Sequence, residues 1–235
     1  MLNYNFFKSQ NDSKELLVML HGFISDSTTY DSHIEQLSQH VNVLTIDLPG
    51  HGKDTSDMND TWDFPYIAHA LDEVLSQYDM YDVYLLGYSM GGRVALYYAL
   101  NGSVALRGLL LESTSAGIQS EADKVERVQV DAARAKVLEI AGLEIFVNDW
   151  EKLPLFRSQY ELDAEVRKAI RANRMSQNPV RLAKALRDYG TGNMPNLWPH
   201  VSSLSVRTLI LTGEKDEKSV QIGQKLKEEI PNSHT

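Results

Sequence analysis

The sequence predicts an α/β fold with a mostly parallel sheet and helices on both faces, because short apolar runs alternate with helix-like segments. The runs are rich in Leu and Val without alternation, as in parallel strands covered on both sides. The predicted strands are residues 16–20, 43–48, 83–86, 106–111 and 206–211. An earlier strand, residues 3–8, precedes the polar stretch 9–14, which predicts an antiparallel hairpin at the sheet edge.

Helices are predicted between these strands, where apolar residues recur every three or four positions. The clearest case places Ile67, Leu71, Val74 and Tyr78 on one helical face. Further helices are expected at residues 34–40, 93–100 and 220–230.

Residues 118–195 contain no strand-like run and are typical of several amphipathic helices, with Gly142, Pro154 and Pro179 as breaks. This pattern predicts a helical cap inserted into a core made of residues 1–117 and 196–235. Such caps can close over a pocket and exclude water, so cap residues are expected to contribute to the site.

The composition limits the possible function classes. The chain is 43% apolar and 23% charged, as in ordinary globular proteins, and its net charge of −9 argues against nucleic-acid binding. It has neither a membrane-length apolar stretch nor the features of a secretory leader at its N-terminus. The absence of cysteine excludes disulfides, thiolate catalysis and cysteine-ligated metals, and it favours the cytoplasm. No residue cluster requires a metal or another cofactor.

The most informative motif is Gly-x-Ser-x-Gly at residues 87–91, between a predicted strand and a predicted helix. In that setting the glycines allow a strained turn that lifts the serine hydroxyl above a parallel sheet, a nucleophile elbow. The same pattern elsewhere is often a plain loop, so the flanking elements carry the interpretation. We therefore predict that Ser89 is catalytic.

An elbow serine requires two backbone N–H donors that stabilise an oxyanion. Met90, the residue after the serine, supplies the first. His21, Gly22 and Phe23 follow the strand that ends at Leu20, so the Phe23 N–H is the expected second donor. The alternative is that His21 and Gly22 simply form a turn at the strand end. Both interpretations can hold, because such a turn would orient the Phe23 N–H.

The catalytic acid is expected in a loop after a later strand, in the chain order serine, acid, histidine. Asp216 fits this position after the strand 206–211, and Glu214 is the alternative. A charged loop exposed to solvent is the competing explanation for a single aspartate, and the position after a late strand argues against it.

The histidine of such a triad should follow one more strand after Asp216. His234 is the only histidine there, and it lies where that strand should begin rather than end. We therefore expect the segment with the catalytic histidine to be missing from this chain. His51 is expected to shape a turn near the site. The histidines expected at the surface are His33, His40, His69 and His200.

Arg93 lies one helical turn after Ser89, on a face where packing against the sheet would favour a small or apolar residue. A guanidinium there needs a carboxylate partner, which predicts substrate binding. From spacing alone, Arg127 and Arg174 are better explained by pairing with local acids on solvated helix faces, Arg127 for example with an aspartate four residues away.

Several motifs together resemble the α/β-hydrolase superfamily and, within it, the MenH enzymes of the menaquinone pathway, the 2-succinyl-6-hydroxy-2,4-cyclohexadiene-1-carboxylate synthases. The shared superfamily motifs are residues 20–23, 47–52, 87–92 and 213–216. The marks more specific to MenH are Arg93, Glu126-Arg127, Trp150 with Pro154-Leu155-Phe156, and Arg174 before Ser176-Gln177-Asn178-Pro179.

This resemblance implies a cofactor-independent lyase that removes pyruvate from a cyclohexene polycarboxylate by 2,5-elimination, with the elbow serine as the base. It implies that Arg93, Arg127 and Arg174 bind the substrate. It also implies that Tyr88 and Trp150 form the pocket wall, although from the sequence alone these two aromatic residues fit core packing equally well. The alternatives are a serine hydrolase of esters, thioesters or C–C bonds, and a non-catalytic protein that retains the pocket. The oligomeric state stays open.

Overall fold

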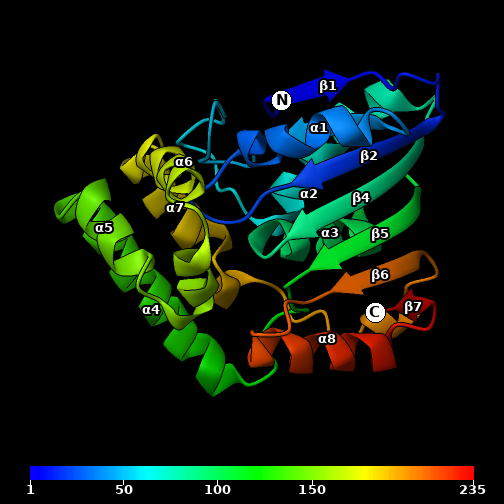
Figure 1. Ribbon diagram of the computed structural model, residues 1–235. Coiled ribbons are helices and arrows are strands. Elements are labelled where there is room, and N and C mark those ends of the chain that lie inside the picture. Colours follow the sequence, from blue (N-terminus) through cyan, green and yellow to red (C-terminus); the bar gives the residue numbers. More distant parts are fainter.

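The computed structural model describes residues 1–235 and contains one seven-stranded sheet in the order β1-β3-β2-β4-β5-β6-β7 (Figure 1). Every neighbouring pair is parallel except β1 with β3, so the predicted parallel sheet is confirmed. The strands are β1 (Tyr4–Phe7), β2 (Glu15–Leu20), β3 (Asn42–Ile46), β4 (Asp82–Tyr88), β5 (Leu106–Glu112), β6 (Arg207–Leu211) and β7 (Ser233–His234).

The predicted hairpin between the first two strands is wrong. β1 lies at the sheet edge as expected, but it pairs antiparallel with β3 and not with β2. The Asn42 side chain explains this path, because it accepts from the Ser9 N–H at 2.9 Å and donates to the carbonyls of Ser13 at 2.7 Å and Glu15 at 3.0 Å. These bonds hold the connection across the start of β3, so the chain passes β3 before it enters β2.

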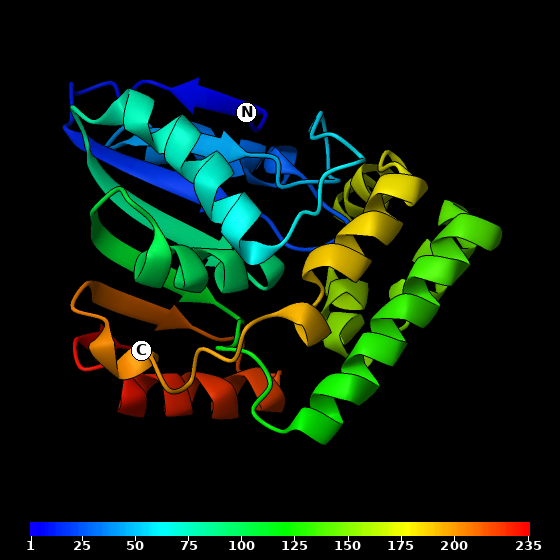
Figure 2. The ribbon, with the colours of Figure 1, turned by 180° about the vertical axis from the view of Figure 1, so that it is seen from behind.

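The core helices cover both faces of the sheet. α1 (Asp31–Leu37) and α8 (Glu217–Glu229) lie on one face, and α2 (Phe64–Leu75) and α3 (Met90–Asn101) lie on the other (Figures 1 and 2). The apolar side chains predicted for α2 are buried, except that Tyr78 falls in a short 3₁₀ turn just after the helix and is only partly buried. None of the helices is both long and apolar enough to cross a membrane.

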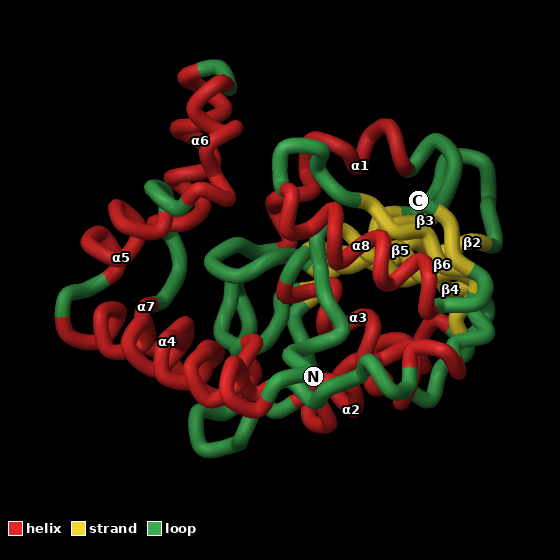
Figure 3. Tube along the Cα trace, turned by 90° about the horizontal axis from the view of Figure 1, so that it is seen from below, coloured by secondary structure: helices red, strands yellow, loops and turns green.

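Four α-helices and three 3₁₀ helices connect β5 to β6, and we call residues 118–195 the cap. The helices are α4 (Glu121–Ile140), α5 (Leu143–Trp150), α6 (Ala164–Met175) and α7 (Pro179–Tyr189). The cap contains no strand, and it lies beyond the carboxyl ends of β2, β4 and β5 (Figures 1 and 3). Gly142, Pro154 and Pro179 each begin or precede an element, as expected of chain breaks.

Candidate active site

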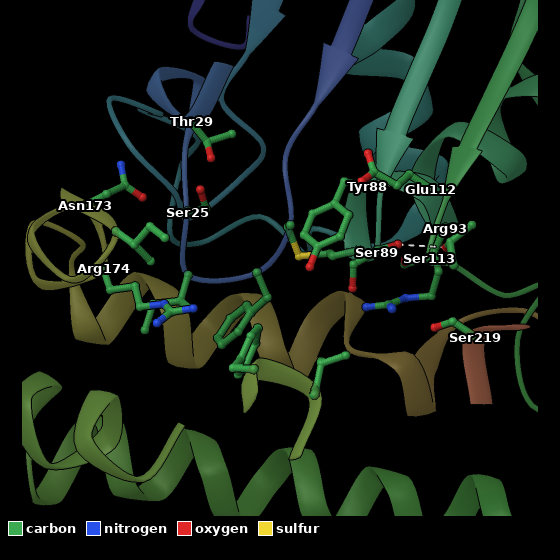
Figure 4. Close-up of a pocket in the computed structure, with 18 of the residues that line it drawn as sticks. Ser25, Thr29, Tyr88, Ser89, Arg93, Glu112, Ser113, Asn173, Arg174 and Ser219 are labelled. Atoms are coloured by element: carbon green, nitrogen blue, oxygen red, sulfur yellow. Dashed lines mark hydrogen bonds between the residues drawn. The ribbon is translucent and has the colours of Figure 1, made fainter. Parts of the chain in front are cut away.

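A cavity of about 1540 Å³ lies between the carboxyl ends of the central strands and the cap (Figure 4). Every site residue that the sequence predicts lines this cavity, from both the core and the cap. They are Phe23, Tyr88, Ser89, Met90, Arg93, Arg127, Trp150, Arg174 and Asp216. The structure thus brings together residues that lie almost two hundred positions apart in the chain.

Ser89 occupies a sharp turn between β4 and α3, with φ of 51° and ψ of −108°. This conformation is strained for a residue with a side chain. A Cβ atom at Gly87 would lie 2.2 Å from the Gly91 carbonyl oxygen, and one at Gly91 would lie 2.3 Å from the Leu20 carbonyl oxygen. Both glycines are therefore required by backbone packing, as the elbow motif predicts.

We expect Gly91→Ala to lower the free energy of unfolding by about 3 kcal/mol, because a backbone oxygen cannot yield to the added methyl group as a flexible side chain would. Urea unfolding followed by circular dichroism measures this change. Gly213→Ala is the matched control, since no atom lies within 4 Å of the position that a Cβ would occupy there, and the change should stay within about 0.5 kcal/mol. Equal stability of the two variants would contradict the packing argument.

Backbone strain is concentrated around the cavity. Besides Ser89, two other cavity-lining residues with side chains have positive φ, Ile24 at 57° and Ser113 at 46°. Ser113 follows β5, and the carbonyl of neighbouring Glu112 accepts the Ser89 N–H at 2.8 Å. Strained residues persist where surrounding contacts enforce them, which is common at functional sites.

Phe23 and Met90 both line the cavity, and neither N–H donates a backbone hydrogen bond in the surrounding turns. His21 fixes the turn that presents Phe23. Its Nδ1 donates to the Gly22 carbonyl at 2.7 Å, and its Nε2 accepts the Leu48 N–H at 3.0 Å. Burial lowers the pKa of His21, so the ring is neutral and structural, in agreement with the predicted turn.

Asp216 lines the cavity at the start of α8, whereas Glu214 is exposed and lies outside it. The Asp216 carboxylate caps the helix by accepting from the Ser219 N–H at 3.1 Å and from the Ser219 hydroxyl at 2.6 Å. Of the two acids suggested by the sequence, only Asp216 lines the same cavity as Ser89.

None of the seven histidines hydrogen-bonds to Ser89. His234 pairs with Leu209 within the sheet, short of the strand end that faces the cavity. His51 is buried beside Pro49 and Tyr189, and burial with the neighbouring His21 lowers its pKa to about 3. His33, which is exposed as expected, also lines the cavity.

Arg93 points into the cavity below Ser89 (Figure 4). Its buried Nε has no hydrogen-bond partner, and no carboxylate forms an ion pair with it. Burial, together with the positive charge of Arg127, lowers the pKa of Arg93 to about 10. This guanidinium is therefore free to bind an anionic ligand.

Both cap arginines are paired with acids: Arg127 with an aspartate four residues later, as spacing alone suggested, and Arg174 with an acid that is not local. Arg127 Nε donates to Asp131 Oδ1 at 3.0 Å, and Asp131 is only 3% exposed. Arg174 is 7% exposed and donates to Glu151, which follows α5, and to Gln159. Both arginines also line the cavity, where Arg174 is buried and the Arg127 side chain is 33% exposed.

Trp150 joins the core to the cap. Its ring meets that of Phe23 edge to face, with 5.4 Å between the ring centroids, and stacks on Phe146 at 5.6 Å. Tyr88 ends β4, and its ring is 2.9 Å from the position that a Cβ at Gly22 would occupy. Both aromatic residues form cavity wall and also pack.

Glu112 and Arg134 are among the titratable residues of the cavity that were not predicted as site residues. Glu112 ends β5 beside Tyr88, is half-buried, and burial raises its pKa. Arg134 lies on α4, seven residues after Arg127 and three after Asp131. That spacing places Arg127, Asp131 and Arg134 on one helical face, a signal that was present in the sequence. No group of three or more potential metal ligands is present.

The chain belongs to the alpha/beta hydrolase family, whose model matches residues 17–234. It is similar to MenH from S. aureus, with 57% identity and a TM-score of 0.98 over 100% of this chain and 88% of that one. It is also 33% identical over 210 residues to the 2-succinyl-6-hydroxy-2,4-cyclohexadiene-1-carboxylate synthase of Salmonella agona, covering 89% of this chain and 81% of the relative. A thermophilic esterase from Thermogutta terrifontis shares 25% identity and a TM-score of 0.83, over 99% of this chain and 82% of that one.

Proposed function

We propose that this protein is a lyase of menaquinone biosynthesis that eliminates pyruvate from a succinyl-cyclohexene polycarboxylate. The cavity chemistry carries the proposal, because cationic side chains from core and cap surround an elbow serine. Arg93 has no acidic partner, while Arg127 and Arg174 keep one face toward the cavity. A substrate with several carboxylates supplies the missing acceptors. The similarity to MenH and to the Salmonella synthase supports the same reaction.

The reaction breaks a C–H bond and a C–O bond and makes a second ring double bond. Ser89, activated by a base, removes the ring proton, and the pyruvyl oxygen leaves with the electrons of the C–O bond, which gives pyruvate after protonation. We assign Asp216 as the acid of the triad, and the Phe23 and Met90 amides as donors to the negative charge that develops. The arginines hold the carboxylates, and Tyr88 with Trp150 forms the wall that limits water access.

Two other functions each have an observation in their favour. The strained elbow and the similarity to an esterase favour a serine hydrolase that acts through an acyl-serine. The lack of a histidine at Ser89 favours a non-catalytic protein that binds a polycarboxylate without converting it. From the composition we also propose a cytoplasmic location.

The test is to incubate the protein with the cyclohexene substrate and to measure pyruvate, with hydrolysis of p-nitrophenyl esters measured in parallel. We expect pyruvate release that Ser89→Ala removes, and no covalent adduct on Ser89 by mass spectrometry during turnover. An acyl-serine together with ester hydrolysis would replace the lyase by the hydrolase. Tight binding of the dicarboxylate product with neither activity would support the non-catalytic protein.

A further inference from the structure

Arg134 is a cavity-lining cation without a hydrogen bond to any other residue. It lies on α4, and its side chain is 28% exposed. Its nearest carboxylate oxygen, Asp131 Oδ1, is 3.8 Å from Nη1, beyond hydrogen-bond distance. The same oxygen accepts from Arg127 Nε at 3.0 Å. The carboxylate of Asp131 therefore pairs mainly with Arg127, and Arg134 is left incompletely paired.

Asp131 is also engaged on its other side, where Oδ2 accepts the Gly192 N–H at 3.4 Å. This one buried carboxylate thus lies within 4 Å of two guanidinium groups, those of Arg127 and Arg134, and its charge also acts on the pKa of Arg93. Burial and the charge of Arg127 lower the pKa of both Arg93 and Arg134. The positive charge in this part of the cavity exceeds the negative charge that the protein supplies.

The unpaired polar atoms in this part of the cavity are hydrogen-bond donors. Arg93 Nε and Trp150 Nε1 are buried and have no partner. Arg134 joins them, because its guanidinium carbon lies 5.3 Å from the centroid of the Trp150 ring. A group that satisfies these donors must bring acceptors and negative charge, as a carboxylate does.

We propose that Arg134 binds one of the two carboxylates that the substrate keeps in the product, in a subsite that it shares with Arg93 and Trp150. The inference rests on the proposed function, because it assigns one more residue to the same polycarboxylate. In this arrangement Asp131 is a positioning residue that orients Arg127. The Trp150 ring packs against the Arg134 guanidinium. The alternative is that Arg134 merely covers Trp150 and stabilises the cap.

Titration calorimetry with 2-succinyl-6-hydroxy-2,4-cyclohexadiene-1-carboxylate, the dicarboxylate product, separates these explanations. We expect Arg134→Met to weaken binding by about 10- to 100-fold, as for loss of a charge-assisted contact in a partly enclosed site. Lys136→Met is the matched control, because it removes the same charge from an exposed position on the same helix. It should change the dissociation constant by less than about twofold.

Monomethyl esters of the same dicarboxylate identify the group that Arg134 binds. The effect of Arg134→Met should disappear with one of the two esters and persist with the other, because the contact is already lost when its carboxylate is esterified. Equal binding by wild type and Arg134→Met, an equal loss in Lys136→Met, or an effect that persists with both esters would overturn the inference. Failure of the wild-type protein to bind the dicarboxylate would instead contradict the proposed function.

Discussion

A polypeptide made of these 235 residues alone is expected to release pyruvate from the cyclohexene substrate on the order of 10⁴-fold more slowly than MenH from S. aureus, measured as kcat. The reason is the hydrogen bonding around Ser89. Both ring nitrogens of His21 are hydrogen-bonded to the backbone, and His51 bonds to the Pro49 carbonyl through Nδ1 while its Nε2 is buried without a partner. His234 lies within the sheet. A serine hydroxyl is a weak base unless a neighbouring group accepts its proton.

Two variants of the same protein make this expectation specific. Asp216→Ala should lower the residual rate by less than about threefold, because a triad acts as a unit and the acid has no histidine to orient. Ser89→Ala should leave binding of the dicarboxylate product unchanged, since the hydroxyl moves a proton and does not hold the molecule. A rate equal to that of the S. aureus enzyme, lost on His33→Ala, would show that the cavity-lining His33 serves as the base.

Much of the fold follows from local patterns. Unbroken Leu and Val runs identify β2 to β6, because parallel strands bury both faces, and the glycines around Ser89 identify the turn that aims the serine. The chain order of strand ends also places Asp216 in the cavity. These features could be predicted because each depends on residues near one another in sequence or on the direction shared by parallel strands.

Other features depend on partners far apart in the chain. The pairing of β1 with β3 follows from Asn42, which holds a connection made of residues 9–14. Arg174 is held by Glu151, twenty-three residues earlier, and no helical periodicity links the two. Arg134 could have been found from its spacing to Asp131, but the spacing cannot show that this helix face lines a cavity and not solvent.

Arg93 illustrates how the site and the stability of the fold are opposed. Its Nε is buried without a partner, so the folded protein bears a desolvation cost that only a bound anion removes. Arg181 also has a buried Nε without a partner, but it differs from Arg93 because its Nη2 donates to the buried Asp54 carboxylate at 2.7 Å and to the Ser56 carbonyl. The Arg93 guanidinium is left available for a ligand, whereas the Arg181 guanidinium is paired within the protein.

We therefore expect Arg93→Met to weaken binding of the dicarboxylate product by about 100-fold or more, while the free energy of unfolding stays unchanged or rises by about 1 kcal/mol. Methionine keeps most of the side-chain volume but removes the unpaired charge. Arg93→Lys should recover little binding, because an ammonium retains the charge without the planar fork. Titration calorimetry and urea unfolding measure the two quantities.

Arg181→Met is the control, and it should show the opposite pattern, with an unfolding free energy lower by about 3 kcal/mol, because the buried Asp54 carboxylate loses its cation. Its effect on the dissociation constant should be small, since Arg181 lies outside the cavity. If Arg93→Met destabilised the protein as much as Arg181→Met and left binding intact, Arg93 would be a structural residue. Loss of binding without loss of stability would instead mark a guanidinium that is held in the fold for its substrate.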